Sequence, residues 1–575
     1  MKLKNIILSV LMLALVSTSC SDQMNYQEYN DYDKDFVTLN FGNVGGLMTT
    51  IYLDIDTDFG NFDGALLGSA TDESQYAYSG NQIEDFYNGA WSPTNAKSST
   101  WGSSYRGIAN CNLFLEEFTD LTFPELQLNS DYPQQMFRYN NYKWEVRFLR
   151  AYFYFNLVRQ YGDVPFTDRL LTAEETNELE RRPAQEIFDF IINECDAVKD
   201  EIIADYRNLG DMALPAEPAE TGRVDRLTVL ALKARTALYA ASPLFNKDNN
   251  QELWYRAAKA NKELLDAAEN AKMKLLPDYA ELWSRDNYAD VSEIIFGRRA
   301  NRTTNTLEAN NFPIGLEGTK GGNCPTQTLV DAYEMQATGL RPDETGSGYD
   351  PANPYEGRDP RFELTIAKNG DEKWPNWNST PLQTYQGGIN GEPKDGGTPT
   401  SYYLKKYLQA AVDTRPSTSN AFYHTWITYR LGEFYLNYAE AVFRYLGTPY
   451  ATSSEFPMSA AEAASQTRNR VKMPGIPMGL SNDAFWDKYK NERMVELAFE
   501  GHRFWDVRRW KEADKHFKSI DQMKITQNSD GSFNYERKTV NRLWDDKMYF
   551  FPIPQSEIRK NPNLTQNPGW DKYLN

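Results

Sequence analysis

The sequence predicts a mainly α-helical fold built from repeated helical pairs, and three segments indicate it. In Glu145 to Pro165, apolar residues recur at helical spacing among arginines, which is typical of a half-buried amphipathic helix. Ala151 within it leaves room for another helix to approach closely. The same pattern returns in Val224 to Pro243 and in Trp426 to Gly447. Such reuse is the loose signature of tetratricopeptide-like helical pairs, although no strict period links the copies.

The first of these helices has a defined end. Gly162 can take the left-handed conformation just past a helix end, and Pro165 prevents the helix from resuming. A length of 575 residues suggests about four domains. Stacked helical pairs can share one continuous core, however, so the chain need not be divided in this way. We expect one globular unit, with an N-terminal helical region over residues 41–270 and a C-terminal region over residues 271–575.

The N-terminus predicts export and a lipid anchor. Two lysines precede an apolar run from Ile6 to Val16 that is too short to span a membrane, which is the layout of a secretory signal over residues 1–19. Cys20 follows directly, where bacterial lipoprotein processing acylates the thiol, although Ser17 holds a place usually taken by Leu or Val. Two or more acyl chains suffice for stable anchoring. The polar residues 20–40 are expected to be a flexible tether.

Composition excludes several classes of site. A net charge of -19 and a pI near 4.9 exclude nucleic acid as a ligand, because a phosphate backbone requires a basic face. Three histidines leave little for a zinc site or a Ser-His dyad. Apart from Cys20, the chain has Cys111, Cys195 and Cys324, which are compatible with one disulfide or with three free thiols.

The segment from Asp54 to Ala65 is rich in aspartate. Asp54, Asp56 and Asp58 alternate as oxygen ligands do in a calcium-binding loop. The match then fails, because Phe59 stands where the loop needs Gly and Ala65 where it needs a bidentate Glu. A solvated acidic loop is therefore favoured over a structural calcium site, and no other cofactor is expected.

Residues 70–112 begin as a segment rich in Ser, Gly, Asn and Thr, and loops on a rigid scaffold are where binding residues concentrate. Trp91 lies outside any helical stripe, which predicts an exposed stacking platform. Trp101 begins a helical run and is favoured as a core residue. The candidate ligand-binding residues of this segment are Asp72, Glu73, Tyr76, Trp91, Asn95 and Trp101.

A second loop-rich portion extends over residues 299–424. Its Gly-rich stretch, Gly318 to Pro325, lacks the Lys-Ser/Thr ending of a phosphate loop, which excludes nucleotide binding of that kind. Aromatic residues spaced through a Gly/Pro-rich segment cannot all be buried by their own secondary structure. Trp374, Trp377 and Tyr385 are therefore candidate ligand contacts, with packing onto the helical body as the equally weighted alternative.

The segment from Asn491 to Trp510 is dense in Glu, Asp and Arg. Two of its carboxylates could form an acid–base pair. Opposite charges alternate there at helical spacing beside large apolar residues, however, so a paired and partly buried salt-bridge network is favoured. Further on, Tyr549 to Phe551 is expected to pin the C-terminal tail to the body.

Several segments together resemble the SusD/RagB family of surface glycan-binding lipoproteins, and they follow one another in family order. The segments are WGSSYRGIANCN, EVRFLRAYFYFNLVRQYGDVP, RVDRLTVLALKARTALYAASP, LVDAYEM, EGRDPRFELTI, ITYRLGEFYLNYAEA, NERMVELAFEGHRFWDVRRW and YFFPIPQSEIRKNPNLTQNPGW, with the lipoprotein start at Cys20. The resemblance covers nearly the whole mature chain.

The resemblance implies a SusD-like fold of about four tetratricopeptide-like helix pairs in a right-handed scaffold, with a looped portion that carries the ligand. It implies an outward-facing lipid anchor on the outer membrane and no catalysis. It also implies a partner, a SusC-like TonB-dependent transporter, for which the protein would act as the lid that captures and delivers oligosaccharide. The family's ligand loops, carried over onto this sequence, give Asp72, Glu73, Trp91, Asn95, Gly322 and Asn323.

Sugars suit the residue types of these loops, because their apolar C–H faces stack on Trp and Tyr and their hydroxyls pair with polar side chains. Two other classes of protein remain as alternatives. An exported helical glycoside hydrolase would use two carboxylates for turnover. A tetratricopeptide scaffold that binds a peptide would present a long concave groove free of loops.

Overall fold

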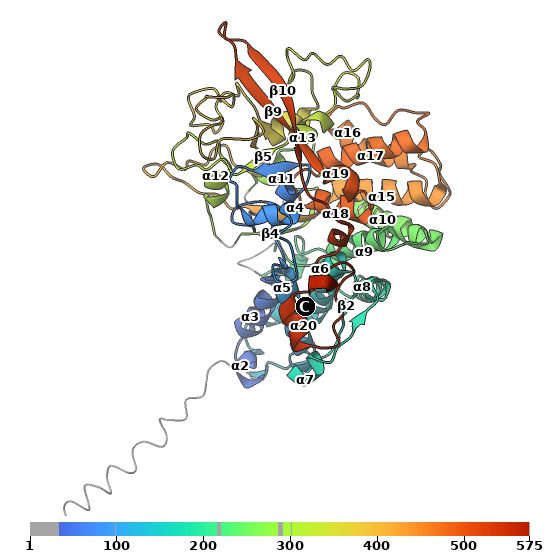
Figure 1. Cartoon of the computed structure of the whole chain (residues 1–575). Helices are drawn as coiled ribbons and strands as arrows, with labels where there is room; N and C mark the ends of the chain where they lie inside the picture. Colours follow the sequence, from blue (N-terminus) through green and yellow to red (C-terminus); the bar gives the residue numbers. More distant parts are fainter. Residues whose placement is uncertain (1–33, 98, 215–219, 286–290, 301, 574–575) are drawn as a thin grey trace, which may run out of the picture.

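The structure is a computed structural model, which describes residues 34–97, 99–214, 220–285, 291–300 and 302–573 (Figure 1). The expected signal peptide, Cys20 and most of the predicted tether lie outside the described residues. The described part of the predicted tether is not extended chain. Lys34–Thr38 forms helix α2 with Val37 buried, and the Asn40 side chain caps the next helix.

In the part of the chain that the structure describes, eight helices pack one against the next in chain order, which gives four consecutive pairs. Their predicted pairing is confirmed, and the loop-rich portion is inserted between the two helices of the third pair. The eight are α5 (Ser99–Glu117), α6 (Tyr132–Tyr161), α8 (Ala184–Val198), α9 (Arg226–Ala241), α10 (Gln251–Asn270), α15 (Leu431–Leu446), α16 (Ala460–Arg470) and α17 (Asn482–Glu496).

Helix α6 is the central helix of the N-terminal half. It packs against α5, α8, α9 and α3 (Phe41–Tyr52), and its C-terminal half is buried on nearly every side. The prediction of a half-buried amphipathic helix is therefore wrong, because neighbours cover its polar face as well. Its predicted end is confirmed, since Gly162 follows the last helical residue with φ 72°. Gly107 of α5 lies directly against the Phe153 ring, so these two helices approach closely there.

Residues 426–430 were predicted to begin a helix, and this is wrong. They belong to strand β8 (Thr425–Arg430), which pairs antiparallel with β4 (Ile294–Arg299). The sequence TWITYR is rich in β-branched and aromatic residues that favour a strand, and α15 begins directly after it. The two other predicted helices are observed as α6 and α9.

The remaining elements are short, and the strands form five antiparallel pairs, β1–β5, β2–β3, β4–β8, β6–β7 and β9–β10. The other helices are α4 (Asp85–Asn88), α7 (Ala173–Thr176), α11 (Glu281–Ser284), α12 (Thr306–Asn311), α13 (Gln327–Ala332), α14 (Pro360–Thr365), α18 (His502–Arg509), α19 (Ala513–His516) and α20 (Gln555–Lys560). The other strands are β1 (Ser74–Tyr76), β2 (Val164–Pro165), β3 (Arg181–Arg182), β5 (Asn323–Pro325), β6 (Ile366–Ala367), β7 (Tyr403–Leu404), β9 (Ser519–Gln527) and β10 (Phe533–Asn541).

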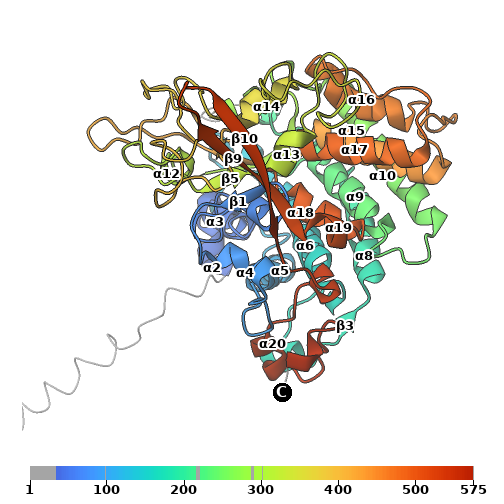
Figure 2. The ribbon, with the colours of Figure 1, turned by 45° about the horizontal axis from the view of Figure 1, so that its top comes forward.

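Two hydrophobic cores correspond to the helical body and to the loop-rich portion. In Figure 1 the loop-rich portion, the β9–β10 hairpin and α4 lie above, whereas α2, α3 and α5 to α8 lie below, and α10 and α15 to α17 lie to one side. Figure 2 shows the hairpin across the front of the molecule. The tail returns to the helical body, where Phe551 packs on Trp91 with ring centroids 4.6 Å apart. The predicted pinning of the tail is confirmed.

The charged segment near the C-terminus forms the predicted network of buried ion pairs. Glu496 of α17 contacts Arg361 at 2.7 Å and Arg430 at 2.7 Å, and also pairs with Arg470. These arginines come from α14, from the end of β8 and from the end of α16. The network therefore ties the helical body to the loop-rich portion where the two cores meet.

All three cysteines that the structure describes, Cys111, Cys195 and Cys324, are buried free thiols. None of the described helices is both long enough and apolar enough to cross a bilayer.

Candidate functional site

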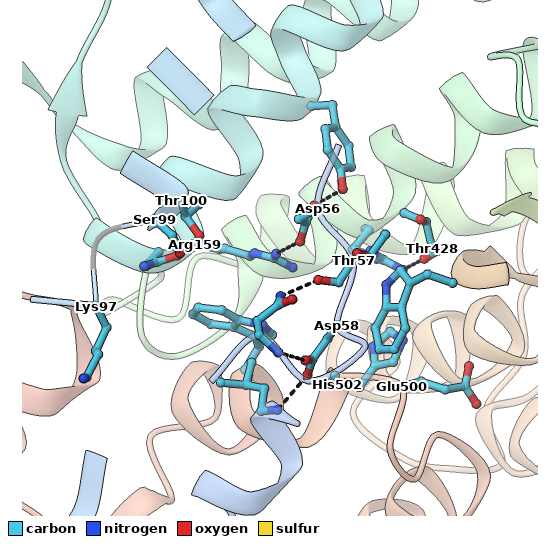
Figure 3. A pocket seen from close by; sticks show the side chains of 18 of the residues that line it. Asp56, Thr57, Asp58, Lys97, Ser99, Thr100, Arg159, Thr428, Glu500 and His502 are labelled. Atoms are coloured by element: carbon cyan, nitrogen blue, oxygen red, sulfur yellow. Dashed lines mark hydrogen bonds and ion pairs between the residues drawn. The ribbon is translucent and has the colours of Figure 1, made fainter. Parts of the chain in front are cut away.

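A pocket of about 130 Å³ is lined by residues of both hydrophobic cores (Figure 3). Its walls are formed by the acidic loop after α3, the start of α5, the C-terminal half of α6, α9, β8, the turn that leads into α18, and Phe551 of the tail. The acidic loop and the segment before α5 are the two loops that the sequence had singled out.

Asp56 stands at the mouth of the pocket and holds the acidic loop onto α6. Its carboxylate pairs with Arg159 at 3.1 Å, accepts a hydrogen bond from Asn156 at 2.9 Å and accepts another from Tyr152. Desolvation acts to raise the pKa of Asp56, but the Arg159 charge and these hydrogen bonds outweigh it and lower the pKa. Asp56 is therefore an ionised acceptor at the pocket mouth.

The three aspartates of the disfavoured calcium alternative do not converge on one point. Asp54 turns away to pair with Arg106, and Asp58 accepts backbone N–H groups of its own loop, the shortest from Leu67 at 2.6 Å. Desolvation raises the pKa of Asp58 to about 6. Within the described residues, no group of three or more His, Cys, Asp and Glu side chains is arranged to hold a metal ion.

A strained turn between α17 and α18 carries two further side chains into the pocket. Phe499 has φ 60° and Gly501 has φ 78°, and a positive φ is costly for a bulky residue such as Phe. Between them, Glu500 is fixed by Arg430 and Lys406 at 2.7 Å each. His502 follows and lines the pocket. Strain of this kind clusters at functional sites, which points to this turn.

His502 is held as a neutral imidazole. Burial lowers its pKa well below the usual value, and the surrounding arginines, Arg235 foremost, lower it further. No hydrogen bond from the part of the chain that the structure describes engages its ring nitrogens. A neutral imidazole presents one donor and one acceptor, so His502 can pair with a hydroxyl group.

Strand β8 contributes Trp426 and Thr428 on one face, because side chains alternate along a strand. The Thr428 side chain is 8% exposed, yet its Oγ1 has no hydrogen-bond partner among the described residues. The buried Nε of Arg159 is likewise unpartnered there. Buried polar groups are normally satisfied, so two unpaired ones lining one pocket indicate a missing ligand or water.

Aromatic rings form the apolar part of the wall. Tyr407 stacks on Trp426 with centroids 5.5 Å apart, and the Arg159 guanidinium lies 4.7 Å from the ring centre of Trp505. Tyr239 and Phe551 also line the pocket. A small polyhydroxylated ligand would find apolar surface beside carboxylate, imidazole, hydroxyl and guanidinium groups.

The candidate residues before the first long helix have structural partners instead. Asp72 is buried and forms a bidentate pair with Arg503 at 2.8 and 2.7 Å. Glu73 is buried with neither carboxyl oxygen hydrogen-bonded within the described chain. Burial, and then the neighbouring Asp72 charge, raise the pKa of Glu73 to about 8. Asp72 lines a separate pocket beside Arg503, but that arginine already occupies both oxygens of its carboxylate, and Glu73 is 1% exposed.

The two predicted ligand loops do meet, because β1 and β5 pair and place Tyr76 opposite Asn323. Their contacts are internal. The Tyr76 hydroxyl donates to Asn310 at 3.0 Å, and the Asn323 amide oxygen accepts from the Leu66 N–H at 2.9 Å. Gly322 leaves no room for a Cβ beside Asn310. These residues fasten the loop before β1 to the loop-rich portion.

The prediction that Trp91 is an exposed platform is wrong. Its side chain is 2% exposed and packs against Phe86, Phe551 and Trp570, because the C-terminal tail covers it. Asn95 donates to Asp85 at 2.9 Å and is half-buried. Trp101 is a core residue of α5, as favoured, and packs on Tyr161.

The aromatic candidates of the second loop-rich portion pack onto its core. Trp374 is 9% exposed, and Trp377 donates from Nε1 to the Val412 carbonyl at 2.9 Å. Tyr385 is half-buried against Phe533. Trp377 and Tyr385 keep exposed surface, and their role as ligand contacts stays a prediction.

No sequence pattern indicated the residues that do converge, namely Trp426, Thr428, Arg159, His502 and Trp505. The alternation of TWITYR could have revealed the two on β8, had the segment been interpreted as a strand. The other three stand in helical segments, where only the fold shows which side chains meet.

Comparison with known proteins gives two matching family profiles. The SusD family matches residues 292–570, and a family described as starch-binding associating with outer membrane matches residues 56–235. SusD-like protein P2 of Formosa agariphila is 24% identical over 453 residues, which cover 74% of this chain and 73% of that protein. The starch-binding protein SusD of Bacteroides thetaiotaomicron is 23% identical over 539 residues, covering 87% and 84%.

Solved structures share the fold over almost the whole chain. A SusD-like protein of Bacteroides fragilis superposes with a TM-score of 0.72 at 26% identity and covers 93% of this chain and 98% of its own. A laminarin-binding SusD-like protein superposes with a TM-score of 0.61 at 20% identity, covering 92% and 99%. The mainly helical architecture is thus SusD-like.

Proposed function

We propose that this chain, which belongs to the SusD/RagB family of carbohydrate-binding proteins, captures an oligo- or polysaccharide. The proposed binding site is the pocket that has Asp56 at its mouth. The observation that carries the proposal is the pair of unpartnered buried polar groups, Thr428 Oγ1 and Arg159 Nε, beside aromatic rings. A sugar hydroxyl can satisfy both groups while the ring of the sugar covers apolar surface.

The names of the relatives support a glycan as the ligand. One is a starch-binding protein and another binds laminarin, so the family likeness extends across different polysaccharides. A binding screen should therefore include both starch and laminarin. Peptide binding by the helical scaffold is the second candidate, and a glycan panel without any retention would favour it.

The delivery role is also proposed. Cys20 would carry the lipid anchor on the outer membrane, facing outward, and a SusC-like TonB-dependent transporter would receive the glycan from this protein as its lid. The match to an outer-membrane-associated starch-binding family supports this placement.

We further propose binding without catalysis. Retaining and inverting glycosidases need two carboxyl groups free to act on the glycosidic bond. In this pocket Asp56 is paired with Arg159, Asp58 accepts backbone N–H groups, and Glu500 is held by Arg430 and Lys406. Analysis of the polysaccharide for cleavage after long incubation tests this directly.

The first experiment screens the chain without its first 20 residues by electrophoresis through gels that contain starch, laminarin and other plant, fungal and host polysaccharides. We expect retardation by one class of glycan and no cleavage products. Retardation by none of them would contradict glycan capture.

The second experiment locates the site with a matched pair of variants. Thr428→Val removes the unpartnered hydroxyl from the pocket, and Thr425→Val makes the same change on the same strand. Thr425 is 7% exposed with an equally unpartnered Oγ1, but it does not line the pocket. Loss of one hydrogen bond predicts about two- to tenfold weaker binding for Thr428→Val only. Equal affinities in calorimetry would place the glycan elsewhere.

A further inference from the structure

The size of the pocket limits how much of a glycan it can hold. Its volume is about 130 Å³, whereas pockets that bury a drug-sized ligand measure about 300–1,000 Å³. The space fits one small ring and excludes a run of linked rings. An oligosaccharide can therefore place only one of its units inside.

Ten of the residues that line the pocket are buried, among them Arg235, Thr428 and Glu500 at 6%, 8% and 5% exposed. The exposed lining residues are Asp56, Asn61 and Ser99, which lie on the acidic loop and at the start of α5. Figure 3 shows Arg159 between these two segments, with Ser99 on one side and Asp56 on the other. The opening thus lies on one side of the molecule.

A unit inside a polysaccharide chain carries a neighbour at both ends, so it needs two ways out of a binding site. A terminal unit needs only one. We infer that this pocket recognises the terminal unit of a glycan chain and leaves the rest of the chain outside the mouth. This inference rests on the proposed function and specifies the form of its substrate.

Neighbouring charges favour an uncharged unit. The Arg159 guanidinium is already paired with Asp56, and Arg235 forms a bidentate pair with Glu433 at 2.7 and 2.6 Å. An anionic sugar would meet Asp56 at the mouth and Glu500 within the pocket, and the third lining cation, Lys97, is also already paired, with Asp85 at 2.6 Å. A neutral hexose unit meets no such repulsion.

The test uses the polysaccharide that the protein retains, before and after limited acid hydrolysis, in calorimetric titrations of the same protein. Hydrolysis multiplies chain ends without changing the mass of sugar. We expect the binding capacity per gram to rise in proportion to the measured number of chain ends. The free monosaccharide should compete with the polymer for binding. Thr428→Val should weaken the binding of the polymer and of the monosaccharide by the same factor.

Two outcomes overturn the inference, and they are distinguishable. A capacity per gram that stays constant while the chain ends multiply, with no competition by the monosaccharide, would mean recognition of internal units and would leave glycan capture intact. Absence of binding to every polysaccharide and monosaccharide would overturn the proposed function together with this inference.

Discussion

At the scale of single residues, burial decides what each candidate side chain does. In the sequence, both Trp91 and Asp72 resemble exposed loop residues. In the structure, the C-terminal tail covers Trp91, and Arg503 pairs with Asp72. Thr428 is also buried, but its hydroxyl has no partner in the described chain and the residue lines a pocket. The site is therefore indicated by an unsatisfied group that also lines a pocket, and not by residue type alone.

Glu73 gives a prediction at this scale. Because burial raises its pKa from 4.5 to about 8, the folded protein keeps a proton there that the unfolded chain releases. Its contribution to stability is fully present below about pH 4.5 and is lost as the pH rises to about 8, by up to about 1.4 kcal/mol per pH unit. We expect Glu73→Gln to gain stability over the wild type progressively from pH 5 to pH 8.

The measurement is the free energy of unfolding of both proteins in urea at each pH. Other titrating groups are common to both proteins and cancel in the difference. A difference that is the same at every pH from 5 to 8 would show that the Glu73 carboxyl is already ionised in the folded state.

At the scale of elements, close packing of α5 on α6 fixes the first helical pair. A Cβ on Gly107 would overlap the Phe153 ring, whereas a Cβ on Gly102 of the same helix meets nothing within 4 Å. Gly107→Ala is therefore expected to lower the free energy of unfolding by about 1–3 kcal/mol. Gly102→Ala should be neutral or stabilise by up to about 1 kcal/mol, because Ala favours helix more than Gly does.

Thermal and urea unfolding of the two variants give the comparison. Equal stabilities for Gly107→Ala and Gly102→Ala would mean that the two helices separate without cost at this contact.

Some features of the helices and strands could be predicted from the sequence, and others could not. Periodicity and Gly162 predicted where α6 ends, and alternating charges predicted the ion pairs of α17 and α18. Periodicity could not show that α6 would be covered on its polar face, because that depends on helices far along the chain. Family loops predicted Asn323 and the composition of residues 70–112 predicted Tyr76 as separate candidates, and only the pairing of β1 with β5 shows that the two lie together and are buried.

At the scale of the whole molecule, buried charge joins the helical body to the loop-rich portion. The single carboxylate of Glu496 forms ion pairs with Arg361, Arg430 and Arg470, and all four side chains are 2% exposed or less. Removing its charge leaves buried arginines uncompensated. Glu496→Gln is therefore expected to cost about 3–5 kcal/mol of stability in a urea titration.

Glu363→Gln is the matched control, because Glu363 pairs with Lys368 at 2.7 Å but is 51% exposed in its side chain. Exposed pairs contribute about 0–1 kcal/mol. Similar losses for the two variants would contradict a special role of the buried network.

The pocket is lined by residues of both cores that lie far apart in the sequence, which explains why no single segment of sequence reveals it. A crystal structure of the protein soaked with oligosaccharides of the retained polysaccharide tests this account most directly. We predict one sugar unit in the pocket, hydrogen-bonded to Thr428 Oγ1 and Arg159 Nε, with the rest of the chain leaving past Asp56. A sugar bound at another surface, with this pocket holding only water, would contradict it.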